Sequence, residues 1–172
     1  MEQHIYIGLG SNLGNRIEHL QWVCRHFQDH ALLAVQAVSP VYTSAAHTLG
    51  DQAQPAYLNA VVQLASKLEP LQVLNVLHAC ERAAGRDREK EGRWGSRTLD
   101  LDILAYGTER VDMPGLTIPH RRLADRRFVL QPWSDLAPGF IVPAPFGKTV
   151  ADLLAGCEDH AELAKTSLQL LD

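Results

Sequence analysis

The chain of 172 residues contains only three cysteines, Cys24, Cys80 and Cys157, which are widely spaced and form no C-x-x-C pattern. This spacing supports neither a disulfide framework nor a zinc site, so we expect free thiols in a reducing compartment. No apolar stretch reaches the roughly 18–20 residues that a membrane-spanning helix needs. The first ten residues lack the basic region and the long apolar core of a signal peptide. We therefore expect a cytoplasmic protein without a membrane partner.

Several motifs of nucleotide binding and acyl transfer are absent. The sequence has no G-x-x-x-x-G-K-[ST], so ATP would not be held by a P-loop, and no Ser or Cys lies in a nucleophile elbow. Gly8, Gly10 and Gly14 follow a predicted strand, but their spacing does not match G-x-G-x-x-G. We interpret these glycines as a tight turn from strand to helix at the edge of a site.

Basic residues are few overall but concentrated in one region. The net charge is −4, which argues against broad nucleic-acid binding. Between Arg82 and Arg127, however, lie 11 of the 16 Lys and Arg residues and 8 of the 20 Asp and Glu residues. A compact basic region on an acidic chain fits a small polyanionic ligand, although a solvated surface with chance clustering is the alternative.

The run Arg93-Trp-Gly-Ser-Arg97-Thr-Leu-Asp-Leu-Asp102-Ile is the most informative part of the sequence. Its second half alternates as a strand does, with leucines on one face and Asp100 and Asp102 on the other. Two carboxylates on one face can hold hard divalent ions, and the arginines just upstream suit phosphate. The run favours phosphoryl-type chemistry, and the alternative is an edge strand with a solvated acidic face.

The remaining pattern predicts one domain, residues 1–172, with a ferredoxin-like split βαβ core. This α+β class has an antiparallel four-stranded sheet, helices on one face and extra C-terminal helices. Residues 86–96 are polar, have no clear period and look like a loop. The predicted strands cover residues 4–9, 32–42, 57–65 and 100–106, and the predicted helices cover 16–29, 70–84, 122–136 (interrupted near Pro132) and 149–155.

Together these stretches resemble the 6-hydroxymethyl-7,8-dihydropterin pyrophosphokinase family of folate biosynthesis. The central run is the most specific match, and the others follow in the family's order over about residues 5–135. The other matching stretches are Gly10-Ser-Asn-Leu-Gly14, Gln54-Pro-Ala-Tyr57-Leu-Asn59-Ala-Val, Glu81 with Gly85-Arg86, Thr117-Ile-Pro-His120, and Arg126 with Phe128.

The resemblance implies transfer of a diphosphate from ATP to the pterin's hydroxymethyl group, with release of AMP. It implies two Mg²⁺ ions held by Asp100 and Asp102, with Arg86 and Arg97 as further catalytic residues. The implied pterin-binding residues are Ser44, Ala45, Tyr57, Asn59, Trp94 and Phe128. The implied nucleotide-binding residues are His78, Glu81, Arg86, Arg88, Trp94, Arg97, Ile103, Thr117, His120, Arg121 and Arg126. Other enzymes of the folate pathway are the expected protein partners.

The sequence departs from the family pattern at several places, and two of them involve residues beside the expected binding sites. Ser44-Ala45-Ala46 stands where the family usually has Thr-x-Pro, and Gly115 stands where relatives often have Arg. Two other functions stay open at this point. A two-metal phosphodiesterase or nuclease would use the same carboxylates without consuming ATP. A non-catalytic nucleic-acid module on a ferredoxin-like sheet would carry an aromatic RNA-binding signature, which the sequence lacks.

Overall fold

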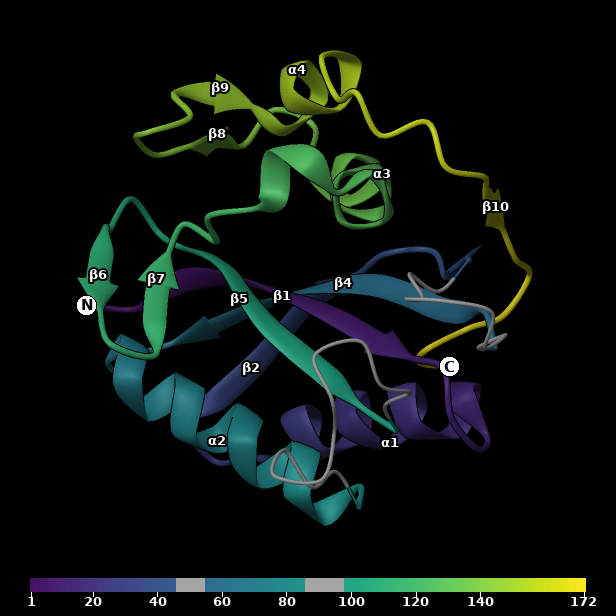
Figure 1. Ribbon diagram of the computed structural model, residues 1–172. Coiled ribbons are helices and arrows are strands. Elements are labelled where there is room, and N and C mark those ends of the chain that lie inside the picture. Colours follow the sequence, from purple (N-terminus) through teal and green to yellow (C-terminus); the bar gives the residue numbers. More distant parts are fainter. Residues whose placement is uncertain (46–54, 86–97) are drawn as a thin grey trace.

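The computed structural model describes residues 1–45, 55–85 and 98–172 as a central antiparallel sheet with helices on both faces (Figure 1). The strands of the sheet run in the order β10-β3-β4-β1-β5, and β2 also pairs with β4. Two further hairpins, β6–β7 and β8–β9, lie outside this sheet. The strands are β1 (Gln3–Ser11), β2 (Leu33–Val38), β3 (Tyr42–Ser44), β4 (Tyr57–Ser66), β5 (Asp100–Tyr106), β6 (Val111–Met113), β7 (Leu116–Ile118), β8 (Ile141–Val142), β9 (Lys148–Thr149) and β10 (Leu163–Lys165). The helices are α1 (Arg16–Asp29), α2 (Pro70–Ala83), the 3₁₀ turn η1 (Leu123–Asp125), α3 (Arg127–Leu136) and α4 (Val150–Ala155).

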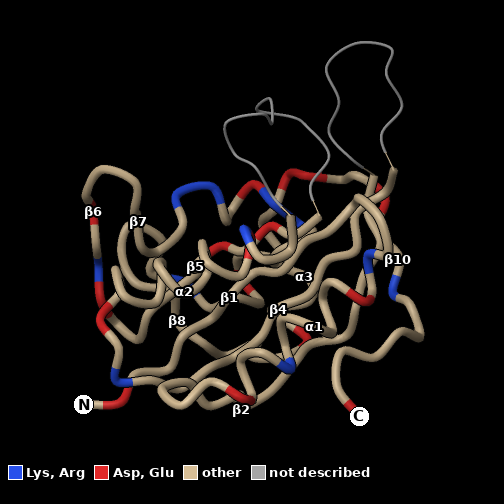
Figure 2. The backbone as a smooth tube through the Cα atoms, turned by 90° about the horizontal axis from the view of Figure 1, so that it is seen from below, with Lys and Arg blue, Asp and Glu red and all other residues tan. Residues whose placement is uncertain are grey.

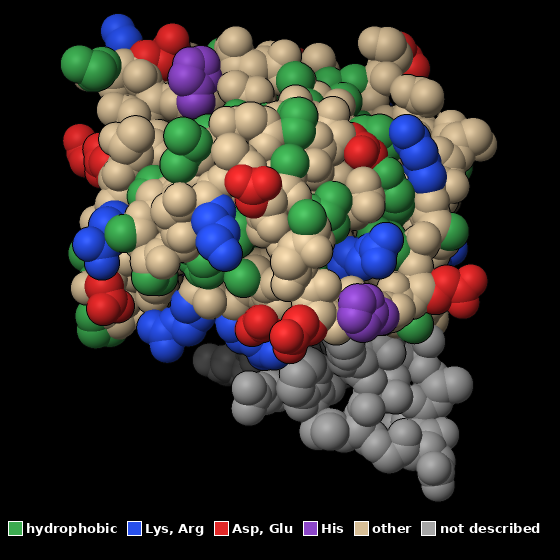
Figure 3. All heavy atoms as spheres, turned by 90° about the horizontal axis from the view of Figure 1, so that it is seen from above, with side chains coloured by type: hydrophobic (Ala, Val, Ile, Leu, Met, Phe, Trp, Pro, Cys, Tyr) green, Lys and Arg blue, Asp and Glu red, His purple; other side chains and the backbone are tan. Residues whose placement is uncertain are grey.

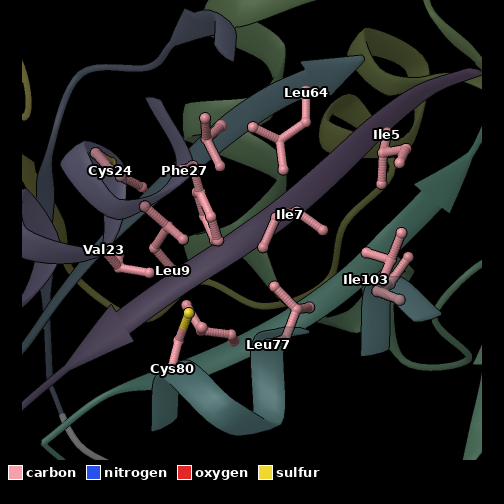
Figure 4. Packing of buried hydrophobic residues seen from close by; sticks show 14 of the residues in the cluster. Ile5, Ile7, Leu9, Val23, Cys24, Phe27, Leu64, Leu77, Cys80 and Ile103 are labelled. Atoms are coloured by element: carbon pink, nitrogen blue, oxygen red, sulfur yellow. The ribbon is translucent and has the colours of Figure 1, made fainter. Parts of the chain in front are cut away.

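Helices α1 and α2 cover one face of the sheet because each has a capped start and one apolar side. The Asn15 side chain accepts a hydrogen bond from the Glu18 N–H at the start of α1, and Glu69 and Gln72 form a capping box before α2. Their apolar sides pack on alternate residues of β1, β4 and β5, as Figure 4 shows for Ile7, Phe27 and Leu77. This cluster is the main core.

The second layer covers the opposite face of the sheet. Leu104 of β5 and Val61 of β4 pack there against Leu130 and Trp133 of α3, and α4 contributes Leu153. Figure 3, a view onto this side of the molecule, shows basic, acidic and apolar side chains interspersed on its surface. None of the helices in the described ranges has the length and apolarity that crossing a bilayer requires.

Two features of the sheet differ from the prediction made from the sequence. The sheet has six strands rather than four. The strand predicted over residues 32–42 is divided into β2 and β3, since Pro40 has no N–H and the chain bends there. At the bend, Ser39 donates its N–H to the Val61 carbonyl and accepts the Val61 N–H with its hydroxyl. Residues 163–165, which the sequence did not assign to any element, form β10.

The predicted helix 122–136 also differs from the structure. Its interruption falls at Arg126, between η1 and α3, and not near Pro132, which lies inside α3. Arg126 has φ −120° and ψ 87°, so the chain is extended at this point before α3 begins. The change of direction lets residues on both sides of Arg126 face the same cavity.

Candidate active site

A cavity of about 1200 Å³ lies on the face of the sheet that α3 covers. Its floor is formed by β1, β4 and β5, and its walls by the β6–β7 hairpin, the η1–α3 segment and the middle of α2, which contributes Leu74 and His78. Acidic and basic positions lie side by side along the edge near β5 and β7 (Figure 2). The cavity thus brings charged residues of both signs next to apolar and aromatic ones.

The two carboxylates of β5 line this cavity, as the alternation in the sequence predicted. Leu101 and Ile103 point into the main core, whereas Asp100 and Asp102 face the opposite side. Arg126 approaches from the η1–α3 segment, with its Nη1 3.8 Å from Oδ2 of Asp102. The pair is therefore a site of high negative charge with one cation already beside it.

The donor set suits magnesium bound together with a phosphate ligand. Within the described ranges no group of three or more His, Cys, Asp or Glu side chains is placed to hold a metal ion. Mg²⁺ usually binds through one or two carboxylates and completes its shell with waters and substrate phosphates. Asp100 and Asp102 fit this pattern, since they supply oxygen ligands at the floor of an open cavity.

Glycines of β1 form the floor between the two ends of the cavity. Gly10 pairs with Asn59 of β4 on one side and with Asp100 of β5 on the other, and Gly8 pairs with Asp102. Neighbouring strands are about 4.8 Å apart, so Asn59 and Asp100 are separated by about 10 Å across Gly10. A Cβ on Gly10 would lie 3.6 Å from the Tyr57 ring and 3.7 Å from Oδ1 of Asn59. The absence of side chains leaves room for a ligand to lie across β1.

The end of the cavity on β3 and β4 suits a flat heterocycle. Asn59 is buried and donates from Nδ2 to the Ser44 hydroxyl over 2.7 Å. Tyr57 starts β4 and pairs with Ser44, while Phe128 reaches the cavity from α3. An amide at the same end as two aromatic rings can read the donor–acceptor edge of a heterocycle that stacks on the rings.

Basic side chains gather at the other end, beside the carboxylates. Arg121, Arg122 and Arg126 all line the cavity. His120 lies among them, and burial, reinforced by Arg126, lowers its pKa to about 4. Its Nδ1 accepts the Arg122 N–H over 3.2 Å, which leaves the proton of the neutral ring on Nε2. This end can therefore bind an anion with guanidinium groups and a neutral imidazole donor.

Most residues predicted for the site from the sequence lie together in this cavity. Glu81 differs: it is buried on α2 and is not among the residues that line the cavity. Arg86, Arg88, Trp94 and Arg97 lie outside the described residues. The predicted residues that line the cavity are Ser44, Ala45, Tyr57, Asn59, His78, Asp100, Asp102, Ile103, Thr117, His120, Arg121, Arg126 and Phe128.

The sequence did not identify several residues of the cavity, Arg122 among them. The first strand was predicted to end at residue 9 with the glycines as a turn at the edge of a site, whereas Gly8 and Gly10 both lie within β1, which continues to Ser11; only Gly14, with φ +71°, lies beyond the strand. Sequence reasoning also did not assign Asp112 of the β6–β7 hairpin, or Glu158 and Asp159 after α4, to the site. Gly8 and Gly10 are two residues apart, as Asp100 and Asp102 are. This shared spacing was the signal in the sequence that could have placed the two glycines on the cavity face of a strand.

The amino-acid sequence matches one known protein family over most of its length. Residues 6–138 match the family model described as 7,8-dihydro-6-hydroxymethylpterin-pyrophosphokinase. The chain belongs to this family. Its resemblance to the family in sequence motifs is thereby confirmed.

Individual relatives match between 78% and 91% of the chain. The chain is 42% identical over 157 residues to the 2-amino-4-hydroxy-6-hydroxymethyldihydropteridine pyrophosphokinase of Pseudomonas aeruginosa, covering 91% of this chain and 93% of that protein. The protein of the same name from Haemophilus influenzae is 37% identical over 155 residues, covering 90% and 93%. A folate synthesis bifunctional protein of Arabidopsis thaliana is 38% identical over 134 residues, covering 78% of this chain and 27% of that protein.

Solved structures share the fold. Plasmodium falciparum HPPK-DHPS with pteroate superposes with a TM-score of 0.69 at 12% identity, covering 90% of this chain and 42% of that chain. This chain thus corresponds to less than half of that longer protein.

Proposed function

We propose that this chain transfers a diphosphate from ATP to the hydroxymethyl group of 6-hydroxymethyl-7,8-dihydropterin and releases AMP, a step of folate biosynthesis. The observation that carries the proposal is the row Asn59–Gly10–Asp100 across three strands. It joins a heterocycle-binding end to a charged end over about 10 Å without a side chain between them. Family membership supports the same reaction.

At the charged end, Asp100 and Asp102 are proposed to hold two Mg²⁺ ions on the triphosphate. Bound there, the ions would neutralise phosphate charge and favour in-line attack by the hydroxymethyl oxygen. Arg126 and Arg121 would bind phosphate oxygens. The neutral His120 ring, which lies among these arginines, would donate a hydrogen bond from its Nε2–H to another phosphate oxygen. Orientation of the two substrates is then the chain's main contribution to the rate.

At the other end, Tyr57 and Phe128 are proposed to stack on the pterin while Asn59 reads its edge. The Asn59 amide is held by Ser44, so it is oriented before the substrate arrives. Ala45 lines the same end. The hydroxymethyl group would then point across Gly10 towards the carboxylates.

The nucleoside is proposed to bind between α2 and the β6–β7 hairpin. His78 of α2, Ile103 of β5 and Thr117 of β7 line this part of the cavity. The Thr117 hydroxyl accepts a hydrogen bond from Arg121 over 3.1 Å, which ties the hairpin to the phosphate-binding arginines. The roles expected for Glu81, Arg86, Arg88, Trp94 and Arg97 remain predictions.

Several wider expectations also belong to this proposal. We propose that residues 1–172 form one pyrophosphokinase domain with a ferredoxin-like core, which the strand order β5-β1-β4-β2 supports. The free thiols of Cys24, Cys80 and Cys157 support a cytoplasmic location. The Arabidopsis relative named as bifunctional in folate synthesis supports functional linkage to other enzymes of that pathway.

The test is a nucleotide product assay with MgATP and 6-hydroxymethyl-7,8-dihydropterin. We expect AMP in equal amount to the pterin diphosphate, no AMP when the pterin is omitted, and loss of turnover with excess EDTA. Formation of ADP in place of AMP would overturn the proposal. Hydrolysis of a phosphodiester substrate without ATP would instead identify a two-metal phosphodiesterase.

A further inference from the structure

A segment beyond the family match runs along the pterin end of the cavity. The match ends at residue 138, whereas the segment 157–165 follows α4 and leads into β10. Figure 1 shows this part of the chain descending in yellow from α4 to β10 at the edge of the sheet. Glu158 and Asp159 of this segment line the cavity.

Asp159 joins two parts of the backbone through its two carboxylate oxygens. Oδ2 accepts the N–H of Arg127, the first residue of α3, over 3.3 Å, and Oδ1 accepts the N–H of Ala161 over 3.0 Å. The first N–H groups of a helix have no acceptor within the helix, and the Arg126 side chain does not cap α3. A residue 32 positions away in the sequence therefore supplies the acceptor.

The helix start held by Asp159 carries one wall of the pterin end. Phe128 is the second residue of α3, and the Arg126 guanidinium lies 5.8 Å from the centre of its ring. The other wall is Ser44 with Asn59, and here β10 pairs with β3 so that Leu163 is opposite Ser44. Thr166 extends this attachment by bonding the Val41 carbonyl through its N–H and its hydroxyl.

We propose that Asp159 is a positioning residue that sets affinity for the pterin by holding the Phe128 wall at a fixed distance from the Ser44–Asn59 wall. The inference rests on the proposed function, because it assumes that the heterocycle stacks on Phe128. Without the carboxylate, the first turn of α3 loses its acceptor and the Phe128 ring becomes less ordered. Ordering the ring then has to occur on binding, which weakens the complex.

Steady-state kinetics of Asp159→Ala test the proposal directly. We expect KM for 6-hydroxymethyl-7,8-dihydropterin to rise about fivefold, a typical loss for a helix cap. Values of kcat and of KM for MgATP should stay within about twofold of wild type, since the metal-binding carboxylates of β5 and the phosphate-binding His120 and Arg121 lie outside α3. Asp159→Asn retains one acceptor oxygen and should give an intermediate KM, and it also serves if the alanine variant does not fold. The matched control is Glu162→Ala, which removes an exposed carboxylate from the same segment.

A double-mutant cycle with Phe128→Ala separates positioning from a general structural effect. If Asp159 acts through the Phe128 ring, adding Asp159→Ala to Phe128→Ala should not raise the pterin KM further. Equal increases in both substrates' KM values, an unchanged pterin KM in Asp159→Ala, or additive effects in the cycle would each overturn the proposal. AMP formation by the wild-type protein is measured first, so failure of the proposed function is seen separately.

Discussion

At the scale of single residues, the two carboxylates of β5 place like charges on one face of one strand. Asp100 and Asp102 are both partly exposed, and the side chain of Asp102 is 37% exposed beside Arg126 at 3.8 Å. A partly exposed ion pair of this kind contributes little to stability, with typical values of about 0–1 kcal/mol. The placement of both carboxylates in the cavity is therefore better explained by binding than by folding.

Replacing either aspartate by alanine should abolish activity without unfolding the protein. We expect turnover to fall by at least about a thousandfold in Asp100→Ala and in Asp102→Ala, because each loses an oxygen ligand of the metal site. The melting temperature should stay within about 4 °C of wild type, since repulsion between the carboxylates is relieved. Glu109→Ala, which removes an exposed carboxylate after β5, is the control and should keep full activity. Near-normal turnover in either aspartate variant would contradict the metal role.

His120 should make the folded protein less stable in mild acid. Its pKa is about 4 in the folded protein, lowered by burial and then by Arg126, against a usual value of 6.5. Between these values the unfolded chain takes up a proton that the folded protein does not, so the free energy of unfolding falls as the pH falls. The expected loss between pH 7 and pH 5 is about 2 kcal/mol.

Urea unfolding at the two pH values measures this dependence. His120→Gln keeps a hydrogen-bonding side chain but cannot take up the proton, so its stability should differ less between pH 7 and pH 5 than that of wild type. The difference between the two proteins should be largest at pH 5. An equal pH dependence in both would show that other groups cause it.

At the scale of elements, β1 shows how a strand can serve as a floor for a ligand. Both neighbours of β1 present side chains to the cavity, whereas Gly8 and Gly10 present only backbone. Neither glycine has a positive φ. The two glycines therefore matter because they leave space for a ligand, and not because the backbone needs a conformation that only glycine adopts.

Gly10→Ala should reduce activity while leaving stability nearly unchanged. The new methyl group would meet Tyr57 and Asn59 at 3.6–3.7 Å, an ordinary contact distance, so the fold accepts it. It would occupy the path between the two ends of the cavity, and we expect kcat/KM for the pterin to fall at least about tenfold. The control is Gly139→Ala, whose methyl group would meet nothing within 4 Å. Unchanged kcat/KM with Gly10→Ala would contradict the proposed path of the substrate.

The sequence predicted elements well where one local signal decided them. Asn15 and Pro70 mark helix starts by their own chemistry, and the alternation around Asp100 assigned both faces of β5 correctly. Errors arose where tertiary pairing decided the outcome. A glycine normally weakens a strand, yet β1 continues through Gly8 and Gly10 because β4 and β5 pair with it on both sides.

Some residues of the site could be predicted from the sequence and others could not. Asp100 and Asp102 were singled out because two carboxylates on one face suit a metal ion, whereas Tyr57 and Asn59 of β4 were assigned to the site by the resemblance to the family. Asp159 gave no such signal, since an isolated aspartate in a polar segment has many uses. Only the fold brings it to the start of α3, and that arrangement depends on the pairing of β10 with β3.

At the scale of the whole molecule, ligand binding should stabilise the fold through the open cavity between its layers. A non-hydrolysable MgATP analogue at about 100 times its Kd adds about 2.7 kcal/mol to the free energy of unfolding. For a domain of this size the melting temperature should rise by about 5–10 °C. Differential scanning calorimetry measures the shift, with EDTA and Asp100→Ala as controls that should remove most of it. The same shift in the presence of EDTA would show that binding does not need the metal.

The attachment of β10 has a consequence for the order in which the molecule folds. Thr166 and Val41 are bonded although they are 125 positions apart in the sequence, so their pairing closes one of the longest loops in the chain. Contacts of such separation lose more chain entropy when they form and tend to follow the pairing of strands already close together. We expect an early species in which β1, β4 and β5 are paired while the outer edge of β3 still lacks a neighbour. A strand edge with unpaired N–H and C=O groups can pair with another chain and start aggregation. The late pairing of β10 with β3 therefore also protects the folding protein from aggregation.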